Sequence, residues 1–271
     1  MQDKAKKNKK KRELVFKPYK RGTWRNAAAT KQGLKIMLYY LVFVFFYVIL
    51  GGALQFDQTW LRVAANLLLV TVCGMILYVN GAHLGEGEAA LGEIAYAREQ
   101  SGKTVNEKDA ARCFHPMKGW YMFLISIIPA LVICIPHAIM AEKQVYALQA
   151  LPNWVNAFEG HDEVMAPLSY YMNLDTSMHV EDILRVATRV MIFPFANIAT
   201  TDHPDLMLVM DRLSPILAAL PFLGFPLGYL TGPQSRAMVH GDIKTSTKRR
   251  QRREKKALKA RQARAKKNEI I

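Results

Sequence analysis

The hydrophobic residues of this chain are gathered into long uninterrupted stretches. The first occupies residues 36–56 and contains no charged residue. A helix of about 20 apolar residues crosses a bilayer, and one that is apolar all round, without a polar face at 3.6-residue spacing, is suited to lipid. Further stretches of this kind occupy residues 60–79, 120–140 and 206–230. The pattern predicts an all-α integral membrane protein with four transmembrane helices.

The polar segments between these stretches predict the topology. The first two spans are separated by a few residues and form an antiparallel hairpin, and four spans place both ends of the chain on one side. The predicted segments are a basic arm (1–33), a transmembrane hairpin (34–80), a connection (81–118), the third span (119–141), an acidic segment (142–205), the fourth span (206–232) and a basic tail (233–271).

The acidic segment contains one stretch with helical periodicity. Ile183, Val186 and Val190 recur on one face, while Asp182 and Arg189 lie on the other. This is typical of an amphipathic helix. A helix over 184–200 that re-enters or spans the membrane is an alternative. A spanning helix would put the basic tail outside, against the tendency of Lys and Arg to stay in the cytoplasm.

Charge decides the orientation. The formal charge is +15, but residues 1–31 and 248–271 each hold twelve Lys/Arg and two acids, so each end carries +10 and the rest about −5. The segment 81–118 contains five Lys/Arg, whereas 142–205 contains three beside nine acids. The positive-inside rule therefore predicts that both arms are cytoplasmic and that 142–205 is an extracytoplasmic insertion. The absence of Asn-x-Ser/Thr sites fits a bacterial plasma (inner) membrane.

Polar residues within the spans are the first candidate site. An ionisable residue in a span usually faces a partner or a water-filled cavity. One interpretation is an outward-facing polar site that attracts an anion, and the other is an interfacial ion pair between Arg62 and Asp211. The cluster consists of Arg62, Asn66, His137, Asp211 and Arg212.

Two further patterns concern packing and metals. Small residues at four-residue spacing in the last span, Gly224, Gly228 and Gly232, allow close helix packing within the protein or dimerisation, and other membrane subunits are possible partners. Imidazole and carboxylate groups that lie close together outside the spans are acceptable metal ligands, but their spacing matches no metal motif, so we expect no metal or cofactor. These weak candidates are His161, Asp162, His179, Glu181, His203 and Asp205.

No catalytic signature is recognisable, so the sequence favours a non-enzymatic scaffold or assembly factor. The basic arms are expected to bind phosphate, on anionic lipid or on ribosomal RNA. The alternatives are a transporter, or a membrane subunit of one, that uses Arg62, His137 and Asp211, and a membrane-embedded enzyme without a familiar motif. The expected phosphate-binding residues are Arg249, Arg250, Arg252, Arg253, Lys255 and Lys256.

Overall fold

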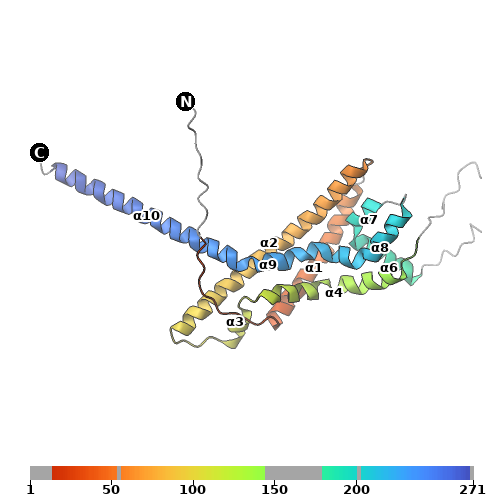
Figure 1. Cartoon of the computed structure of the whole chain (residues 1–271), viewed down its shortest axis with the longest axis horizontal. Helices are drawn as coiled ribbons and strands as arrows, with labels where there is room; N and C mark the ends of the chain where they lie inside the picture. Colours follow the sequence, from red (N-terminus) through yellow and green to blue (C-terminus); the bar gives the residue numbers. More distant parts are fainter. Residues whose placement is uncertain (1–13, 54–55, 144–178, 200–202, 269–271) are drawn as a thin grey trace, which may run out of the picture. The chain divides into compact units, whose positions relative to one another are not determined.

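A computed structural model of the chain describes residues 14–53, 56–143, 179–199 and 203–268, and all regular structure in these ranges is helical (Figure 1). The elements are α1 (Ala27–Ala53), α2 (Thr59–Gln100), α3 (Glu107–Arg112), α4 (Pro116–Met140), α6 (Val180–Met191), α7 (Phe193–Ala199), α8 (Pro204–Ala219), the 3-10 turn η2 (Leu220–Leu223), α9 (Gly224–Leu230) and α10 (Gly232–Asn268).

The chain divides into two compact units. The terminal unit comprises Met1–Thr30, Tyr78–Tyr121 and Phe225–Ile271, and the span unit comprises Lys31–Leu77 and Met122–Gly224. The terminal unit therefore contains the described parts of both ends of the chain. The span unit contains most of the apolar helical residues.

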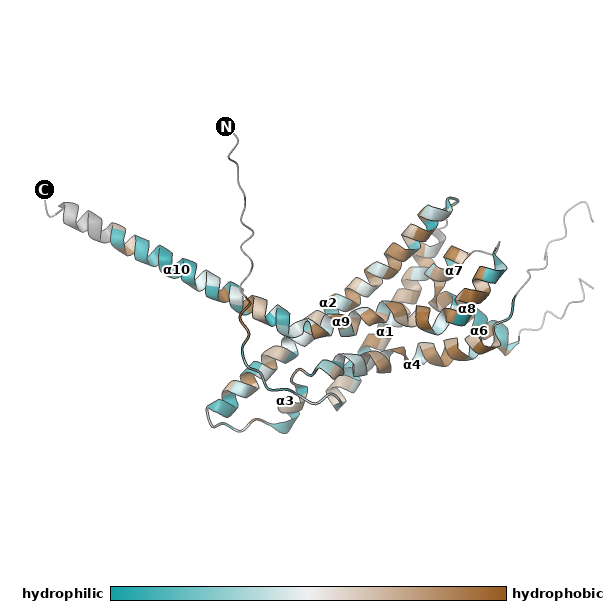
Figure 2. Ribbon diagram, viewed as in Figure 1, coloured by the Kyte–Doolittle hydropathy of each residue, from teal (hydrophilic) through white to brown (hydrophobic). Residues whose placement is uncertain are grey.

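Within the described residues, four helical stretches are long and apolar enough to cross a membrane, as the sequence predicts. They are Ala27–Gly51, Thr59–Gln100, Pro116–Met140 and Pro204–Leu230. Figure 2 shows the same contrast in colour, with hydrophobic residues along the span helices and hydrophilic ones along α10. Length and composition thus mark the chain as a multi-pass membrane protein.

The first span begins earlier than the sequence boundary at residue 34. Asn26 caps α1, because its side-chain oxygen accepts a hydrogen bond of 2.7 Å from the backbone N–H of Ala29. Such a cap satisfies one of the otherwise unpaired N–H groups of a helix N-terminus. Since Ala27, Ala28 and Ala29 are strong helix formers, the helix starts at Ala27.

The second span continues as a helix far beyond its apolar part. α2 has 42 residues, which is about 63 Å at 1.5 Å per residue and roughly twice the hydrocarbon thickness. The glycines predicted to pack closely all lie against this helix. A Cβ at Gly224 would stand 2.2 Å from the Gly74 oxygen, one at Gly228 1.9 Å from the Tyr78 oxygen, and one at Gly232 2.2 Å from the Gly85 carbonyl carbon.

The fourth span is interrupted in its middle. α8 ends at Ala219, one 3-10 turn follows, and α9 begins at Gly224. Pro221 lies in that turn. Because proline has no N–H and its ring clashes with the preceding turn, it breaks the α-helical hydrogen-bond ladder there.

Part of the N-terminal basic arm packs within the terminal unit. Residues 14–26 cross the terminal unit without regular structure, and we call this segment the strap. Backbone hydrogen bonds of 3.2, 3.0 and 3.1 Å run from Val15 to Ala237, from Lys20 to Gly92 and from Gly22 to Phe114. Backbone pairing of this kind tolerates basic side chains, because those side chains can still point into solvent.

Candidate functional site

The polar residues of the span unit converge on Asp211 of α8. The Arg189 guanidinium of α6 donates two hydrogen bonds to the Asp211 carboxylate, 3.2 Å from Nε to Oδ1 and 2.7 Å from Nη2 to Oδ2. His137 Nε2 of α4 lies 3.5 Å from Oδ1 of the same carboxylate. Asp211 is 2% exposed and His137 4%. Three helices thus meet at one buried carboxylate, which we call the Asp211 cluster.

A second polar contact in the span unit joins α2 to α7. Asn197 donates a hydrogen bond of 3.3 Å to the Asn66 oxygen, and Asn66 donates one of 2.8 Å to the Arg62 carbonyl, one turn earlier. Asn66 is fully buried. In the described part of the chain, Nε of Arg62 is also buried and has no hydrogen-bond partner.

The structure brings some of the sequence-predicted residues together and separates others. His137 lies beside Asp211, but the guanidinium that pairs with Asp211 belongs to Arg189 rather than to Arg62. Arg212 is exposed. Sequence reasoning missed Arg189 as a member of the site, although its place on the polar face of an amphipathic helix was a signal that this face had a partner.

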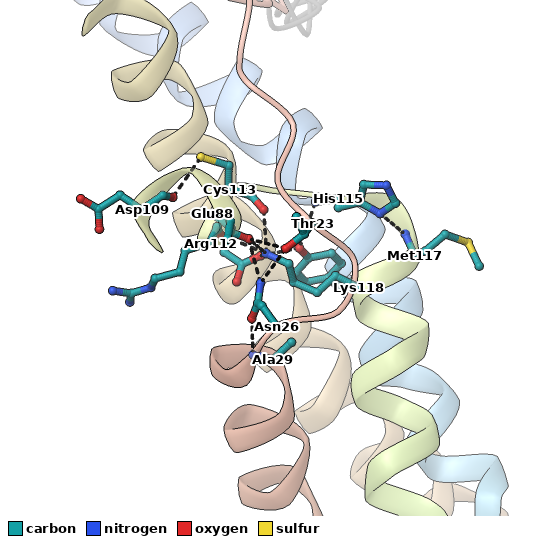
Figure 3. Close-up of polar contacts among 12 residues, drawn as sticks. Thr23, Asn26, Ala29, Glu88, Asp109, Arg112, Cys113, His115, Met117 and Lys118 are labelled. Atoms are coloured by element: carbon teal, nitrogen blue, oxygen red, sulfur yellow. Dashed lines mark hydrogen bonds and ion pairs between the residues drawn. The ribbon is translucent and has the colours of Figure 1, made fainter. Parts of the chain in front are cut away.

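The terminal unit holds a second buried charge cluster, which sequence reasoning missed entirely (Figure 3). Lys118 is fully buried, and its Nζ lies 2.8 Å from Oε2 of Glu88. The same Nζ donates to the carbonyls of Cys113 at 2.6 Å and Arg112 at 3.0 Å. The Tyr229 hydroxyl donates to the same Glu88 oxygen.

This Lys118 cluster is a capping arrangement. The carbonyls at the end of α3 have no partner within the helix, and a lysine ammonium can donate three hydrogen bonds to such groups. Tyr229 also stacks on Phe114 with ring centroids 5.0 Å apart. These contacts therefore close the loop between α3 and α4 and hold it against α2 and α9. A satisfied buried network of this kind rigidifies a fold, so we assign the Lys118 cluster a structural role.

The expected phosphate-binding residues of α10 are exposed, in contrast to both clusters. All described side chains from Lys248 to Ala260 are open to solvent. The first turns of α10 are anchored to α2, because Glu93 pairs with Arg236 at 3.1 Å and with His240 at 2.8 Å. With twelve Lys/Arg and two acids in residues 248–271, most of the positive charge has no acidic partner in its own segment.

The weak metal candidates are scattered. In the described part of the chain, no group of three His, Cys, Asp or Glu residues is placed to hold a metal ion. His179 precedes α6, and its backbone N–H donates to Asp182 at 3.2 Å. Asp205 pairs with Lys143 at 2.6 Å, while His161 and Asp162 lie outside the described residues.

Comparison with known proteins adds no family: no protein-family model, no curated protein and no solved structure matches this chain. The geometry of the chain itself is therefore the basis for its function. Of the three features described, the Lys118 cluster is internally satisfied, the Asp211 cluster is buried, and the basic half of α10 is charged and accessible.

Proposed function

We propose that this protein is a non-enzymatic membrane scaffold or assembly factor whose C-terminal basic helix binds RNA, with ribosomal RNA as the expected partner, on the cytoplasmic side of a bacterial plasma membrane. The observation that carries the proposal is the basic half of α10, a single exposed helix anchored to α2 through Glu93. Positive side chains along an exposed helix attract phosphate backbones.

The position of the anchor favours RNA over lipid head groups. Glu93 lies 14 residues after Val79, the last residue of the apolar part of α2, which is about 21 Å along the helix axis. The head-group layer is about 5–8 Å thick on each side, and even a helix tilt of about 40° would leave Glu93 roughly 16 Å from the hydrocarbon boundary. The basic half of α10 therefore starts from a point outside the lipid layer.

The composition of the basic half points in the same direction. Helices that lie in the membrane interface insert an apolar face between head groups. Between Lys248 and Ala260 the single large apolar side chain is Leu258, which is 58% exposed. Adhesion to lipid would thus depend on charge alone. RNA, by contrast, binds arginine-rich segments through its phosphates and does not require an apolar face.

The test is sedimentation of the purified full-length protein with ribosomes. One variant replaces the six basic residues Arg249, Arg250, Arg252, Arg253, Lys255 and Lys256 by Gln. A matched control replaces six lysines of the other arm by Gln, namely Lys4, Lys6, Lys7, Lys9, Lys10 and Lys11. We expect the α10 variant to lose binding and the control to retain most of it. If all six residues contact phosphate, the slope of log affinity against log salt falls by about 4 to 5.

Competition with liposomes separates the two phosphate sources. Ribosome binding that depends on α10 and survives an excess of anionic liposomes supports the proposal. Binding that anionic liposomes abolish, or equal losses in the two six-residue variants, would reduce the arms to general anchors for acidic lipid.

A transporter, or a membrane subunit of one, is the second candidate function, and the Asp211 cluster favours it. Ionisable residues buried within spans often mark substrate or proton pathways, and His137 and Asp211 are such a pair. In this case Asp211→Asn with Arg189→Met should abolish function while leaving the protein assembled. Truncation after Thr247 should leave transport intact, whereas it should abolish ribosome binding by a scaffold.

A further inference from the structure

Helix α6 exposes its apolar face and turns its polar face toward the protein, which is the reverse of an amphipathic helix on a soluble protein. Its apolar side chains Val180, Ile183 and Val186 are 72%, 56% and 60% exposed. On the opposite face, Thr188 is fully buried and the side chains of Arg185 and Arg189 are each 18% exposed. In water the apolar face of a helix is the buried one.

Ion pairs explain why the polar face turns inward. Arg185 pairs with Asp182 at 2.6 Å within α6, and Arg189 pairs with Asp211 of α8 at 2.7 Å. Both guanidiniums therefore have carboxylate partners on the inner side. A surrounding medium that is itself apolar would stabilise the exposed aliphatic face, because such a medium removes the hydrophobic cost of exposure.

The partners of α6 and α7 give their depth. Asp211 lies seven residues after the start of α8 at Pro204, and Asn66 lies seven residues after the start of α2 at Thr59. Each residue is therefore about 10 Å along its span from the outer end. Arg189 of α6 donates a hydrogen bond to Asp211, and Asn197 of α7 donates one to Asn66. Both short helices thus contact residues that lie about a third of the way into a hydrocarbon core that is roughly 30 Å thick.

The span helix on which α6 packs also exposes apolar side chains. α6 packs on α8, whose Val209, Leu213 and Ile216 are 49%, 43% and 64% exposed. These residues belong to a stretch long and apolar enough to cross a membrane. α6 has 12 residues and α7 has 7, and each is too short to cross by itself.

We infer that α6 and α7 form a re-entrant element in the outer part of the bilayer, with the apolar face of α6 against lipid acyl chains and its polar face against the Asp211 cluster. The occupant of this face is lipid, since the face is aliphatic and α6 packs on a candidate span that exposes aliphatic side chains of its own. The inference is independent of the proposed function, because it concerns a part of the chain remote in sequence from α10.

Site-directed spin labelling in reconstituted bilayers tests the inference. A nitroxide is attached to a cysteine at Val186, with Ile216 as the reference for lipid and Ile243 of α10, 55% exposed, as the reference for water. The parent protein gives the background, since its three cysteines are buried. Collision rates are then measured with oxygen, which concentrates in lipid, and with a water-soluble nickel chelate.

The three possible results are distinct. We expect the collision rate with oxygen to exceed that with the nickel chelate at Val186. The ratio of the oxygen rate to the nickel rate should be close to that at Ile216 and several-fold above that at Ile243. A higher rate with the nickel chelate would place α6 in water and overturn the inference. Low rates with both reagents would also overturn it, because they would show that protein covers this face, from a second copy or from another part of the chain.

A pair of substitutions provides an independent readout. Val186→Gln and Ile243→Gln place the same polar group at positions of nearly equal exposure, 60% and 55%. An amide in hydrocarbon leaves its polar atoms unsatisfied, so Val186→Gln should lower the amount of folded protein recovered from membranes several-fold while Ile243→Gln leaves it unchanged. Equal recovery of the two variants would contradict lipid contact at Val186.

Discussion

The two buried charge clusters use the same kind of ion pair for different purposes. In the terminal unit, Lys118 and Glu88 are 2.8 Å apart, and in the span unit, Arg189 and Asp211 are 2.7 Å apart. The Lys118 ammonium donates its other hydrogen bonds to backbone carbonyls at the end of α3. The Arg189 guanidinium makes a two-point contact that fixes α6 against α8. One pair closes a loop, and the other fastens a helix.

This difference reflects the chemistry of the two cations. A lysine ammonium donates in three directions and suits a ring of carbonyls, whereas the planar guanidinium matches a single carboxylate. Removing one member of a buried ion pair leaves a charge without compensation, while replacing both members by apolar groups can be nearly neutral. Substitutions can therefore measure how much of the fold depends on each pair.

The largest effect is expected from Lys118→Met. It leaves the Glu88 carboxylate buried without its cation and the end of α3 without its cap, so we expect a loss of about 3–5 kcal/mol in the free energy of unfolding. Thermal unfolding of the detergent-solubilised protein measures the loss.

Cys113 provides a local readout for the same variant. Its thiol is fully buried, and burial raises its pKa. Since the thiolate is the reactive form and the thiol is shielded from reagent, alkylation of Cys113 should be slow in the parent. In Lys118→Met, opening of the loop should make it fast, although loss of the Lys118 charge by itself raises the pKa of Cys113. Equal alkylation rates in a chain in which Cys113 is the sole cysteine would show that Lys118 does not hold this loop closed.

The second largest effect is expected at the Asp211 cluster. Asp211→Asn leaves the Arg189 guanidinium without a carboxylate, and we expect a loss of about 2–4 kcal/mol, somewhat less than for Lys118 because Arg189 is partly exposed. Adding Arg189→Met removes the unpaired charge and should recover much of the loss. A double variant as unstable as the sum of the two single variants would show that Arg189 and Asp211 do not act as a pair.

The contrast between the clusters also shows what a sequence can reveal. Apolar runs of twenty residues predict spans reliably, because lipid leaves few alternatives for the backbone. The helical period around Val186 likewise predicts α6. Neither pattern says which face is buried, however, because this depends on whether the surrounding medium is water or lipid. The sequence placed α6 in an outer segment. Its orientation, with the polar face toward the protein, follows only from its contacts with α8.

The buried pairs themselves were beyond sequence reasoning. Lys118 lies in the first turn of an apolar span, where a lysine ordinarily extends toward the membrane surface, and its partner Glu88 is 30 residues away. The sequence offered Arg62 as the ion-pair partner of Asp211. It did not offer Arg189, which lies in the segment expected outside the spans. Pairing over such separations follows from the packing angles of helices, which local patterns do not encode.

A smaller effect is expected from Tyr229→Phe. The ring continues to stack on Phe114, and the loss is limited to the hydrogen bond to Glu88 and a long one of 3.5 Å from the backbone N–H of His115. A hydrogen bond to a charged group contributes about 1.5–3 kcal/mol, and we expect a loss near the lower end because Lys118 continues to satisfy the carboxylate. Differential scanning fluorimetry of the variant measures it. A loss as large as that of Lys118→Met would show that the Tyr229 hydroxyl contributes as much to the stability of the cluster as the Lys118 ammonium.

The smallest effect is expected from Lys143→Gln, which breaks an ion pair with Asp205 at 2.6 Å. The distance is as short as in the buried pairs, but the two side chains are 47% and 79% exposed. Water and salt screen such a pair, and exposed pairs contribute little to stability. A change in midpoint temperature comparable to that of Asp211→Asn would contradict the comparison, because it would mean that ion-pair distance rather than burial determines the loss.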